Sequence, residues 1–142
     1  MNPIFLSVEQ VLWIQEQQRA RDGGLAGVRD WNLLESAVAQ AMATFDGIFL
    51  HDDVFMMAAA YLFHLVKNHA FIDANKRVGL VAALLFLEIN GIVVADPDQI
   101  FYETTIAVAE GKLGKAGLAE VFRRLAVEPA GRSATDGVSR GA

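Results

Sequence analysis

Apolar residues recur every three or four positions along most of the chain, which is the spacing of α-helices with one buried face. The first such stretch follows Ser7-Val8-Glu9-Gln10, where the Ser7 hydroxyl and the Gln10 amide can form a capping box. Its apolar face consists of Val8, Val11 and Leu12, with Gln15 beside them. Gly23-Gly24 ends the pattern, because glycine is common directly after a helix. We predict a first helix that ends there.

Five further helices are indicated by the same spacing. Asp30 is a favourable N-cap for the second, since its carboxylate can accept a backbone N–H of the first turn. The other four are expected over residues 53–68, 75–90, 97–111 and 115–126, the fifth with Pro97 at its first position. The fourth is apolar on most of its circumference, so we expect it to be the central helix, wrapped by the others.

Two segments fall outside the helical pattern. Residues 92–95 (Ile-Val-Val-Ala) favour a β-strand but are too short for a sheet unless they pair with another part of the chain. From residue 127 onward the residues are small and polar, which predicts a disordered tail over 127–142. The sequence therefore predicts an all-α fold: one compact helical domain of about six helices around a central apolar helix, over residues 1–126.

Composition narrows the possible classes of function. Of 142 residues, 54% are hydrophobic and 20% charged, which is typical of a globular protein. The net charge of −5 argues against a protein that binds nucleic acid directly, and the absence of cysteine excludes disulfides and thiol catalysis. There is no signal-peptide pattern and no apolar stretch of membrane-spanning length. We expect a soluble cytoplasmic protein without a membrane partner.

The nine residues from His69 to Arg77 combine an interrupted helix with concentrated charge. One helix is expected to end near Asn68 and the next to begin near Asn75. A helix N-terminus offers unpaired N–H groups and a partial positive charge. Lys76 and Arg77 add two full positive charges at that point, and phosphate is the ligand that suits this combination.

Two further side chains of this segment suit phosphate transfer. The Asp73 carboxylate would repel a phosphate unless a divalent cation lay between them, which indicates Mg²⁺. The imidazole of His69 can act as a general base on a hydroxyl. Phe71, between polar neighbours, is expected to anchor the loop in the core.

A purely structural interpretation stays open beside this one. Asp73 could simply cap the fourth helix, and Lys76 and Arg77 could form a solvated first turn. Cations at a helix N-terminus are, however, unfavourable by about 0.3–1 kcal/mol, so the pattern favours an anion site. Zinc is not favoured, since His64 and His69 are five residues apart and do not share a helical face. Trp13 and Trp31 are expected to be packed in the core or half-buried.

The segment resembles the signature of the Fic/Doc superfamily, His-x-Phe-x-(Asp/Glu)-(Gly/Ala)-Asn-(Gly/Lys)-Arg, at every fixed position. The similarity extends to residues 23–30 and 33–37 before it, and to residues 82–87 and 90–91 after it, and covers about Ser7 to Leu125. Lys76 stands where AMP-transferring members usually have Gly, and Leu80 where they have a second Arg. Both features are similar to the death-on-curing (Doc) toxin branch.

This resemblance implies a toxin of a type II toxin–antitoxin system. Its activity would be that of a kinase, transferring the γ-phosphate of ATP to a threonine hydroxyl of elongation factor Tu and so inhibiting translation. It implies that His69 is the base, that Asp73 helps to hold Mg²⁺, and that Asn75, Lys76 and Arg77 hold phosphates. The residues expected to contact ATP are Lys67, Ala74, Asn75, Lys76 and Arg77. The implied partner is a Phd-like antitoxin, and contact with nucleic acid is expected only through it.

Three alternatives are less favoured. A Fic-type AMP transferase would use the same loop with ATP in the opposite orientation, but the second arginine is missing. A catalytically silent module that binds an antitoxin and acts as a co-repressor would have no need to keep His69, Asp73 and Arg77 together. An RNA-cleaving toxin agrees poorly with the acidic net charge.

Overall fold

Local capping signals define where the first three helices begin. In the computed structural model, which describes residues 2–127, Ser7 and Gln10 form the predicted capping box at the start of α1 (Val8–Asp22). Asp30 accepts the backbone N–H of Leu33 at the start of α2 (Trp31–Gln40), and Asp53 accepts that of Met56 at the start of α3 (Val54–Asn68). The predicted starts of these helices are therefore confirmed, because each depends on residues next to each other in the sequence.

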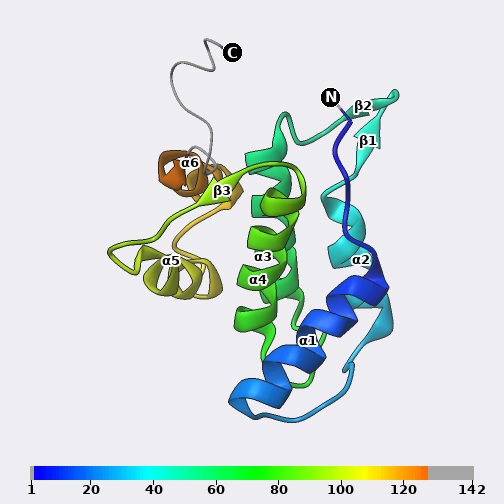
Figure 1. Cartoon of the computed structure of the whole chain (residues 1–142). Coiled ribbons are helices and arrows are strands. Elements are labelled where there is room, and N and C mark those ends of the chain that lie inside the picture. Colours follow the sequence, from blue (N-terminus) through cyan, green and yellow to red (C-terminus); the bar gives the residue numbers. More distant parts are fainter. Residues whose placement is uncertain (1, 128–142) are drawn as a thin grey trace.

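The remaining elements of residues 2–127 are three helices and four very short strands. The helices are α4 (Asn75–Ile89), α5 (Ile100–Ala109) and α6 (Lys115–Leu125), and the strands are β1 (Thr44–Phe45), β2 (Ile48–Phe49), β3 (Val93–Val94) and β4 (Ala126–Val127). Helices α3 and α4 run side by side through the middle, with α1 and α2 on one side and α5 and α6 on the other (Figure 1). This arrangement confirms the predicted all-α helical domain.

The most enclosed helix is α3 rather than α4. It packs against α2, α4, α5 and α6, whereas α4 packs against α1, α3 and α5. The predicted central apolar helix is therefore one of a central pair, and α3, whose sequence is the more apolar of the two, is wrapped on more sides than α4. Gly79 allows the two helices to approach closely: a Cβ there would lie 3.0 Å from a methyl group of Val66 and 3.2 Å from the carbonyl oxygen of Leu62.

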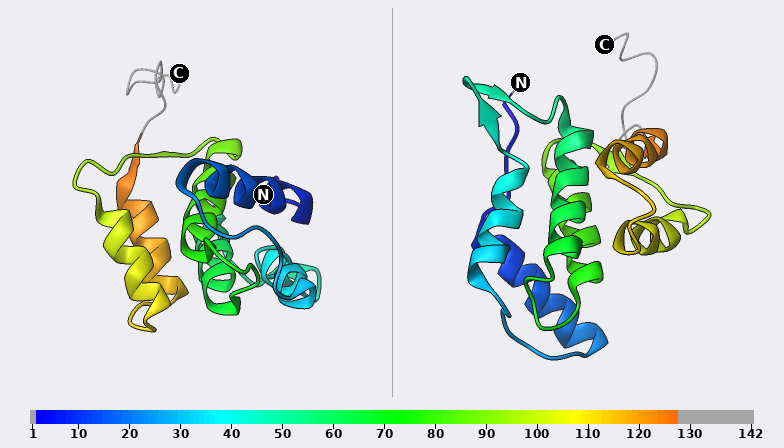
Figure 2. Two further views of the ribbon diagram at one scale, coloured as in Figure 1. Left: turned by 90° about the horizontal axis from the view of Figure 1, so that it is seen from below. Right: turned by 180° about the vertical axis from the view of Figure 1, so that it is seen from behind.

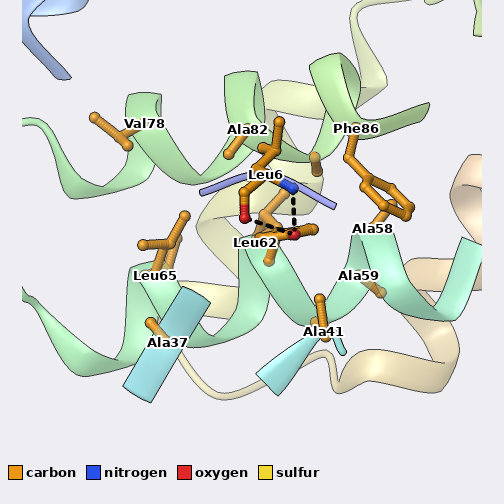
Figure 3. Close-up of a cluster of buried hydrophobic side chains, with 14 of the residues drawn as sticks. Leu6, Ala37, Ala41, Ala58, Ala59, Leu62, Leu65, Val78, Ala82 and Phe86 are labelled. Atoms are coloured by element: carbon orange, nitrogen blue, oxygen red, sulfur yellow. Dashed lines mark hydrogen bonds between the residues drawn. The ribbon is translucent and has the colours of Figure 1, made fainter. Parts of the chain in front are cut away.

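The core between these helices also holds the N-terminal segment. Leu6 lies among side chains of α3 and α4, including Leu62, Ala82 and Phe86 (Figure 3). Its backbone N–H donates to the hydroxyl oxygen of buried Tyr61 at 2.8 Å, and this bond satisfies a polar group that burial would otherwise make unfavourable. Burial also raises the pKa of Tyr61 to about 12, so the phenol stays protonated.

Helix α5 begins later than predicted. Pro97 is not its first residue, because residues 96–99 form a turn and the helix starts at Ile100. The Asp96 carboxylate reaches across this turn and accepts the backbone N–H groups of Ile100 and Phe101. The predicted first position of Pro97 was therefore wrong, because α5 begins three residues later and is capped by the Asp96 side chain.

The predicted β-strand at residues 92–95 pairs with a segment far away in the sequence. Val93 and Val94 pair antiparallel with Val127 and Ala126. The predicted boundary at residue 127 was therefore wrong for Val127, which belongs to β4, and Ala126 lies in the strand rather than in α6. The rest of the predicted disordered tail, residues 128–142, lies outside the described residues.

Two surface features complete the fold. Trp13 and Trp31 are 62% and 54% exposed, so neither is packed in the core, and only Trp31 is close to the half-buried state that was the other expectation. Across residues 2–127, no helix combines the length and the apolar character needed to cross a bilayer.

Candidate functional site

The loop between α3 and α4 contains two left-handed residues that are not glycine. His69 ends α3 with φ 49° and ψ 48°, and Ala74 precedes α4 with φ 69° and ψ 19°. Such conformations cost about 1–2 kcal/mol for a residue with a Cβ. The surrounding structure must therefore hold the loop in shape, and two sets of hydrogen bonds do so.

The first set lies within the loop. The side-chain amide of Asn75 accepts the backbone N–H of Phe71 and donates to its carbonyl oxygen, both at 3.0 Å. Phe71 is only 1% exposed, which confirms its predicted role as the loop's anchor in the core. Asn75 is itself buried, and its side-chain amide is occupied by these two bonds. Because Asn75 is the first residue of α4, its backbone N–H is the group that remains for a ligand at the N-terminus of the helix.

The second set comes from the segment between α1 and α2. Gly27 accepts the backbone N–H of Ile72 at 3.1 Å, and Val28 forms an antiparallel bridge with Phe71. The backbone N–H groups of Arg29 and Asp30 both donate to the carbonyl oxygen of Ala70, at 2.7 and 3.1 Å. The two loops therefore lie against each other at the end of the helix pair remote from β1 and β2 (Figure 2).

Asp73 does not cap α4. One of its oxygens accepts the backbone N–H of Ala74 at 2.8 Å, and the other accepts that of Leu25 at 3.3 Å. These two bonds, together with the charges of Arg77 and Lys76, lower the pKa of the carboxyl group. The structural interpretation of Asp73 as a helix cap was therefore wrong, and the side chain is a partly exposed, ionised carboxylate beside the start of the helix.

The two cations of α4 are held differently. The Arg77 guanidinium donates to the carbonyl oxygens of Gln18 and Gly23 and pairs with Asp22 at 3.4 Å, so it is fixed to the end of α1. Lys76 is exposed and has no carboxylate partner within residues 2–127. No side chain caps the N-terminus of α4. One fixed cation, one free cation and an uncapped helix start therefore coincide.

These groups line one cavity of about 320 Å³. Its walls are His69, Ile72, Asp73, Ala74, Asn75, Lys76 and Arg77. The structure thus brings together all the residues predicted for catalysis. Lys67 does not line this cavity: its ammonium lies near Gly111, after the end of α5. Its predicted contact with phosphate stays a prediction, and its position suits a charge that complements the C-terminal ends of α3 and α5.

A second, smaller cavity of about 130 Å³ adjoins the first and is almost wholly apolar. Lys76 and Arg77 form the border between the two, and the remaining walls are Leu80, Tyr102, Thr105 and Ile106. Sequence reasoning found Leu80 but not the side chains of α5. Nothing in their sequence marks them, because they reach the site only through the packing of α5 against α4.

Sequence reasoning also missed the contribution of residues 24–30 to the loop. The signal was present in the glycines, since Gly24 and Gly27 both have positive φ, at 115° and 116°. A Cβ at Gly24 would lie 2.9 Å from a carboxylate oxygen of Asp73, and one at Gly27 would lie 3.2 Å from Ile72. Glycine is therefore required here for both conformation and space.

The residues present fit Mg²⁺ only as a companion of phosphate. Asp73 is ionised and partly exposed, and it lines the cavity. No group of three or more His, Cys, Asp or Glu side chains that could enclose a metal occurs within the described part of the chain. Mg²⁺ commonly binds through one or two carboxylates and the phosphates of a nucleotide, so a single carboxylate is sufficient in that case.

Comparison with known proteins agrees with this geometry. Residues 5–87, which include the whole loop, match the model of the Fic/DOC family. The chain is 34% identical over 122 residues to "Protein kinase doc" of Escherichia phage P1, covering 84% of this chain and 94% of that protein. It is 45% identical over 73 residues to "Toxin Doc" of Mycolicibacterium smegmatis, covering 51% and 56% of the two chains. With its signature residues gathered in one cavity, the chain belongs to the Fic/DOC family, and it is similar to the Doc proteins within it.

Proposed function

We propose that this protein is the toxin of a toxin–antitoxin pair and that it acts as a protein kinase. It transfers the γ-phosphate of ATP to a threonine hydroxyl of elongation factor Tu, and translation stops. The observation that carries the proposal is the cavity in which His69, Asp73 and the cations of α4 meet. Similarity to a phage protein named a protein kinase supports the same class of reaction.

In the proposed complex the triphosphate lies against the N-terminus of α4. The uncapped backbone N–H groups of Asn75 and Lys76 face that end of the helix, and phosphate oxygens are good acceptors for them. The Lys76 ammonium is free to move with the nucleotide, whereas Arg77 is already oriented by Asp22. The fixed Arg77 can bind the phosphates of the nucleotide, and the mobile Lys76 can stay close to the transferred phosphate as negative charge develops on it in the transition state.

The nucleoside has a suitable place beside the phosphates. The small cavity between α4 and α5 is apolar, and its border is the same pair of cations. An aromatic base can pack there against Leu80 and Tyr102, while its phosphates extend past Lys76. This placement leaves the far end of the triphosphate beside His69.

The chemistry then follows from the side chains at that end. As the threonine oxygen attacks the γ-phosphorus, the His69 imidazole takes the hydroxyl proton. The new O–P bond forms while the bond from the γ-phosphorus to the bridging oxygen breaks, and ADP leaves with that electron pair. Lys76 and Arg77 stabilise the negative charge on the transferred group. When bound at Asp73, Mg²⁺ supplies further neutralisation of the phosphate charge.

Leu80 supports transfer of the terminal phosphate rather than of AMP. It lies one helical turn after Lys76 and lines the apolar cavity. The cations of this part of α4 are therefore confined to its first turn, where they favour the end of the triphosphate. An AMP transferase would instead need the α-phosphate beside His69 and would release pyrophosphate.

The deciding experiment uses ATP labelled at either the α- or the γ-phosphate. Purified protein is incubated with elongation factor Tu, Mg²⁺ and each form of ATP. We expect label on the factor only from the γ position, and a loss of about a hundredfold or more in His69→Ala. Label only from the α position would contradict the kinase proposal and establish an AMP transferase. Lys76→Ala should reduce transfer strongly, whereas Lys112→Ala, which removes an exposed lysine far along the chain, should not.

We also propose that a separate, Phd-like antitoxin neutralises the protein. The similarity to proteins named Doc and toxin Doc supports this partner. Expression of the protein alone should arrest growth, and co-expression with the antitoxin should restore it. Equal growth with the wild-type protein and with His69→Ala would instead favour a silent, antitoxin-binding module.

A further inference from the structure

The C-terminus of α3 is bound by one residue that the proposed mechanism does not use. A helix ends with carbonyl groups that have no partner within the helix. The guanidinium of Arg29 donates from Nε to the carbonyl oxygen of His69 at 2.7 Å and from Nη2 to that of Asn68 at 3.0 Å. Its backbone N–H donates to Ala70 at 2.7 Å. Three consecutive carbonyl groups, those of residues 68, 69 and 70, are therefore bound by Arg29.

Arg29 forms no ion pair within residues 2–127. Six ion pairs occur in this part of the chain, and none includes it. Arg29 is also exposed, so packing in the core does not explain the position of its side chain. Its charge lies at the negative end of the α3 dipole, and its planar fork matches two adjacent carbonyl oxygens. The hydrogen bonds to the C-terminus of α3 are therefore the interactions that hold the Arg29 side chain in place.

The residue bound by Nε is the one whose conformation is unusual. His69 is left-handed, a conformation that glycine or asparagine normally adopts at a helix end. Its backbone orientation sets the direction of the Cα–Cβ bond, and the imidazole lines the cavity. Without the guanidinium, the carbonyl oxygen of His69 loses the donor that fixes the orientation of the following peptide group, although the bonds to Ala70 and Phe71 remain. A rotation of that peptide group would redirect the imidazole.

We propose that Arg29 is a positioning residue that holds His69 in its left-handed conformation and so directs the imidazole at the acceptor hydroxyl. This inference rests on the proposed function for its catalytic consequence. Its structural part, the conformation of His69, is independent of any reaction. Arg29 itself lines neither of the two cavities that the proposed function assigns to the nucleotide.

The kinetic test compares Arg29→Ala and Arg29→Lys with Arg124→Ala. The control removes another exposed arginine, on α6. We expect Arg29→Ala to lower kcat by about ten- to a hundredfold, as a misdirected catalytic group does, with the KM for ATP unchanged within about threefold. Arg29→Lys keeps the charge but not the fork and should fall between. Methylguanidinium added to Arg29→Ala should restore part of kcat and have no effect on Arg124→Ala.

A second measurement does not depend on transfer. The backbone ¹³Cα and ¹³Cβ chemical shifts of His69, assigned by comparison with His69→Ala, report its φ and ψ in the free protein. They should move away from left-handed values in Arg29→Ala and not in Arg124→Ala. Unchanged shifts, or a kcat within twofold of wild type in Arg29→Ala, would overturn the proposal. If the wild-type protein transfers no phosphate, the proposed function fails, and these shifts still decide whether Arg29 holds His69.

Discussion

Asn75 and Phe71 are joined by two hydrogen bonds of 3.0 Å, in which one side-chain amide satisfies both the N–H and the carbonyl group of the other residue's backbone. This requires a side chain with one acceptor and one donor at the same place, and among side chains of this length only asparagine provides both. The requirement for Asn at this position of the signature therefore follows from the shape of the loop.

Asn75→Asp should disrupt this pair. An aspartate can still accept the N–H of Phe71, but its second oxygen would face the carbonyl oxygen with no proton between them. We expect a loss of about 1–3 kcal/mol in the free energy of unfolding, measured by urea denaturation, and loss of transfer activity. Asn32→Asp makes the same change on the exposed surface of α2 and should be nearly neutral. Equal stabilities of the two variants would argue against the pair.

Gly24→Ala should damage the site through Asp73. The new Cβ would lie 2.9 Å from the Asp73 carboxylate, in a backbone conformation with φ 115°. Asp73 or the 24–30 segment must therefore move, and transfer should fall by about tenfold or more. Gly23→Ala is the matched control: φ there is also positive, at 84°, but no atom lies within 4 Å of the new Cβ. It should lower the melting temperature and leave kcat near wild type.

The stability of the protein should fall in mild acid because of His51 and His64, which lie beside the ammonium of Lys115. Lys115 lies 3.3 Å from His51 and 3.1 Å from His64. Burial, then the Lys115 charge, then His51 lower the pKa of His64 from 6.5 to about 4. Burial and Lys115 also lower the pKa of His51, against an opposing effect of Asp52.

The sign follows from proton binding. Above pH 6.5 both the folded and the unfolded chain hold neutral His64, so its contribution to stability is complete. As the pH falls from 6.5 towards 4, the unfolded chain takes up the proton first, and stability is lost. Urea midpoints measured from pH 7 to pH 4.5 should fall in the wild type and less steeply in His64→Gln. Equal slopes for the two proteins would contradict the assignment.

Asp96→Ala should loosen α5. The Asp96 carboxylate accepts two backbone N–H groups at the start of this helix, and no other side chain caps it. We expect a loss of about 1 kcal/mol in the free energy of unfolding. Asp98→Ala, at an exposed position of the same turn, should have little effect. Because α5 forms one wall of the apolar cavity, the KM for ATP should also rise in Asp96→Ala alone.

Sequence reasoning succeeded where the cause of a feature is local. Ser7, Asp30 and Asp53 cap helices that begin at the next residue, and His69 to Arg77 are consecutive, so a motif and a charge pattern reveal them. It failed where two distant segments meet. Val94 and Ala126 are far apart in the chain, and two-residue strands carry too little pattern to predict their pairing.

The same reasoning explains what was missed at the site. Tyr102 and Ile106 look like ordinary residues of a helix, and Arg29 looks like an ordinary surface arginine. Each acquires its role only from the way the helices pack. The exposure of Trp13 and Trp31 was missed for a different reason. The general tendency of tryptophan to be buried does not show which face of a particular helix is buried.

The bridge between Val28 and Phe71 has a consequence for how the site can be moved or lost. A peptide of residues 69–77 contains every signature side chain and two left-handed residues, but it lacks the segment that supplies one of the two sets of hydrogen bonds that hold the loop in shape. Grafted onto another helical hairpin, it would keep its composition and lose its geometry. In a chain whose helices persist but no longer dock, activity should likewise disappear before far-ultraviolet circular dichroism changes.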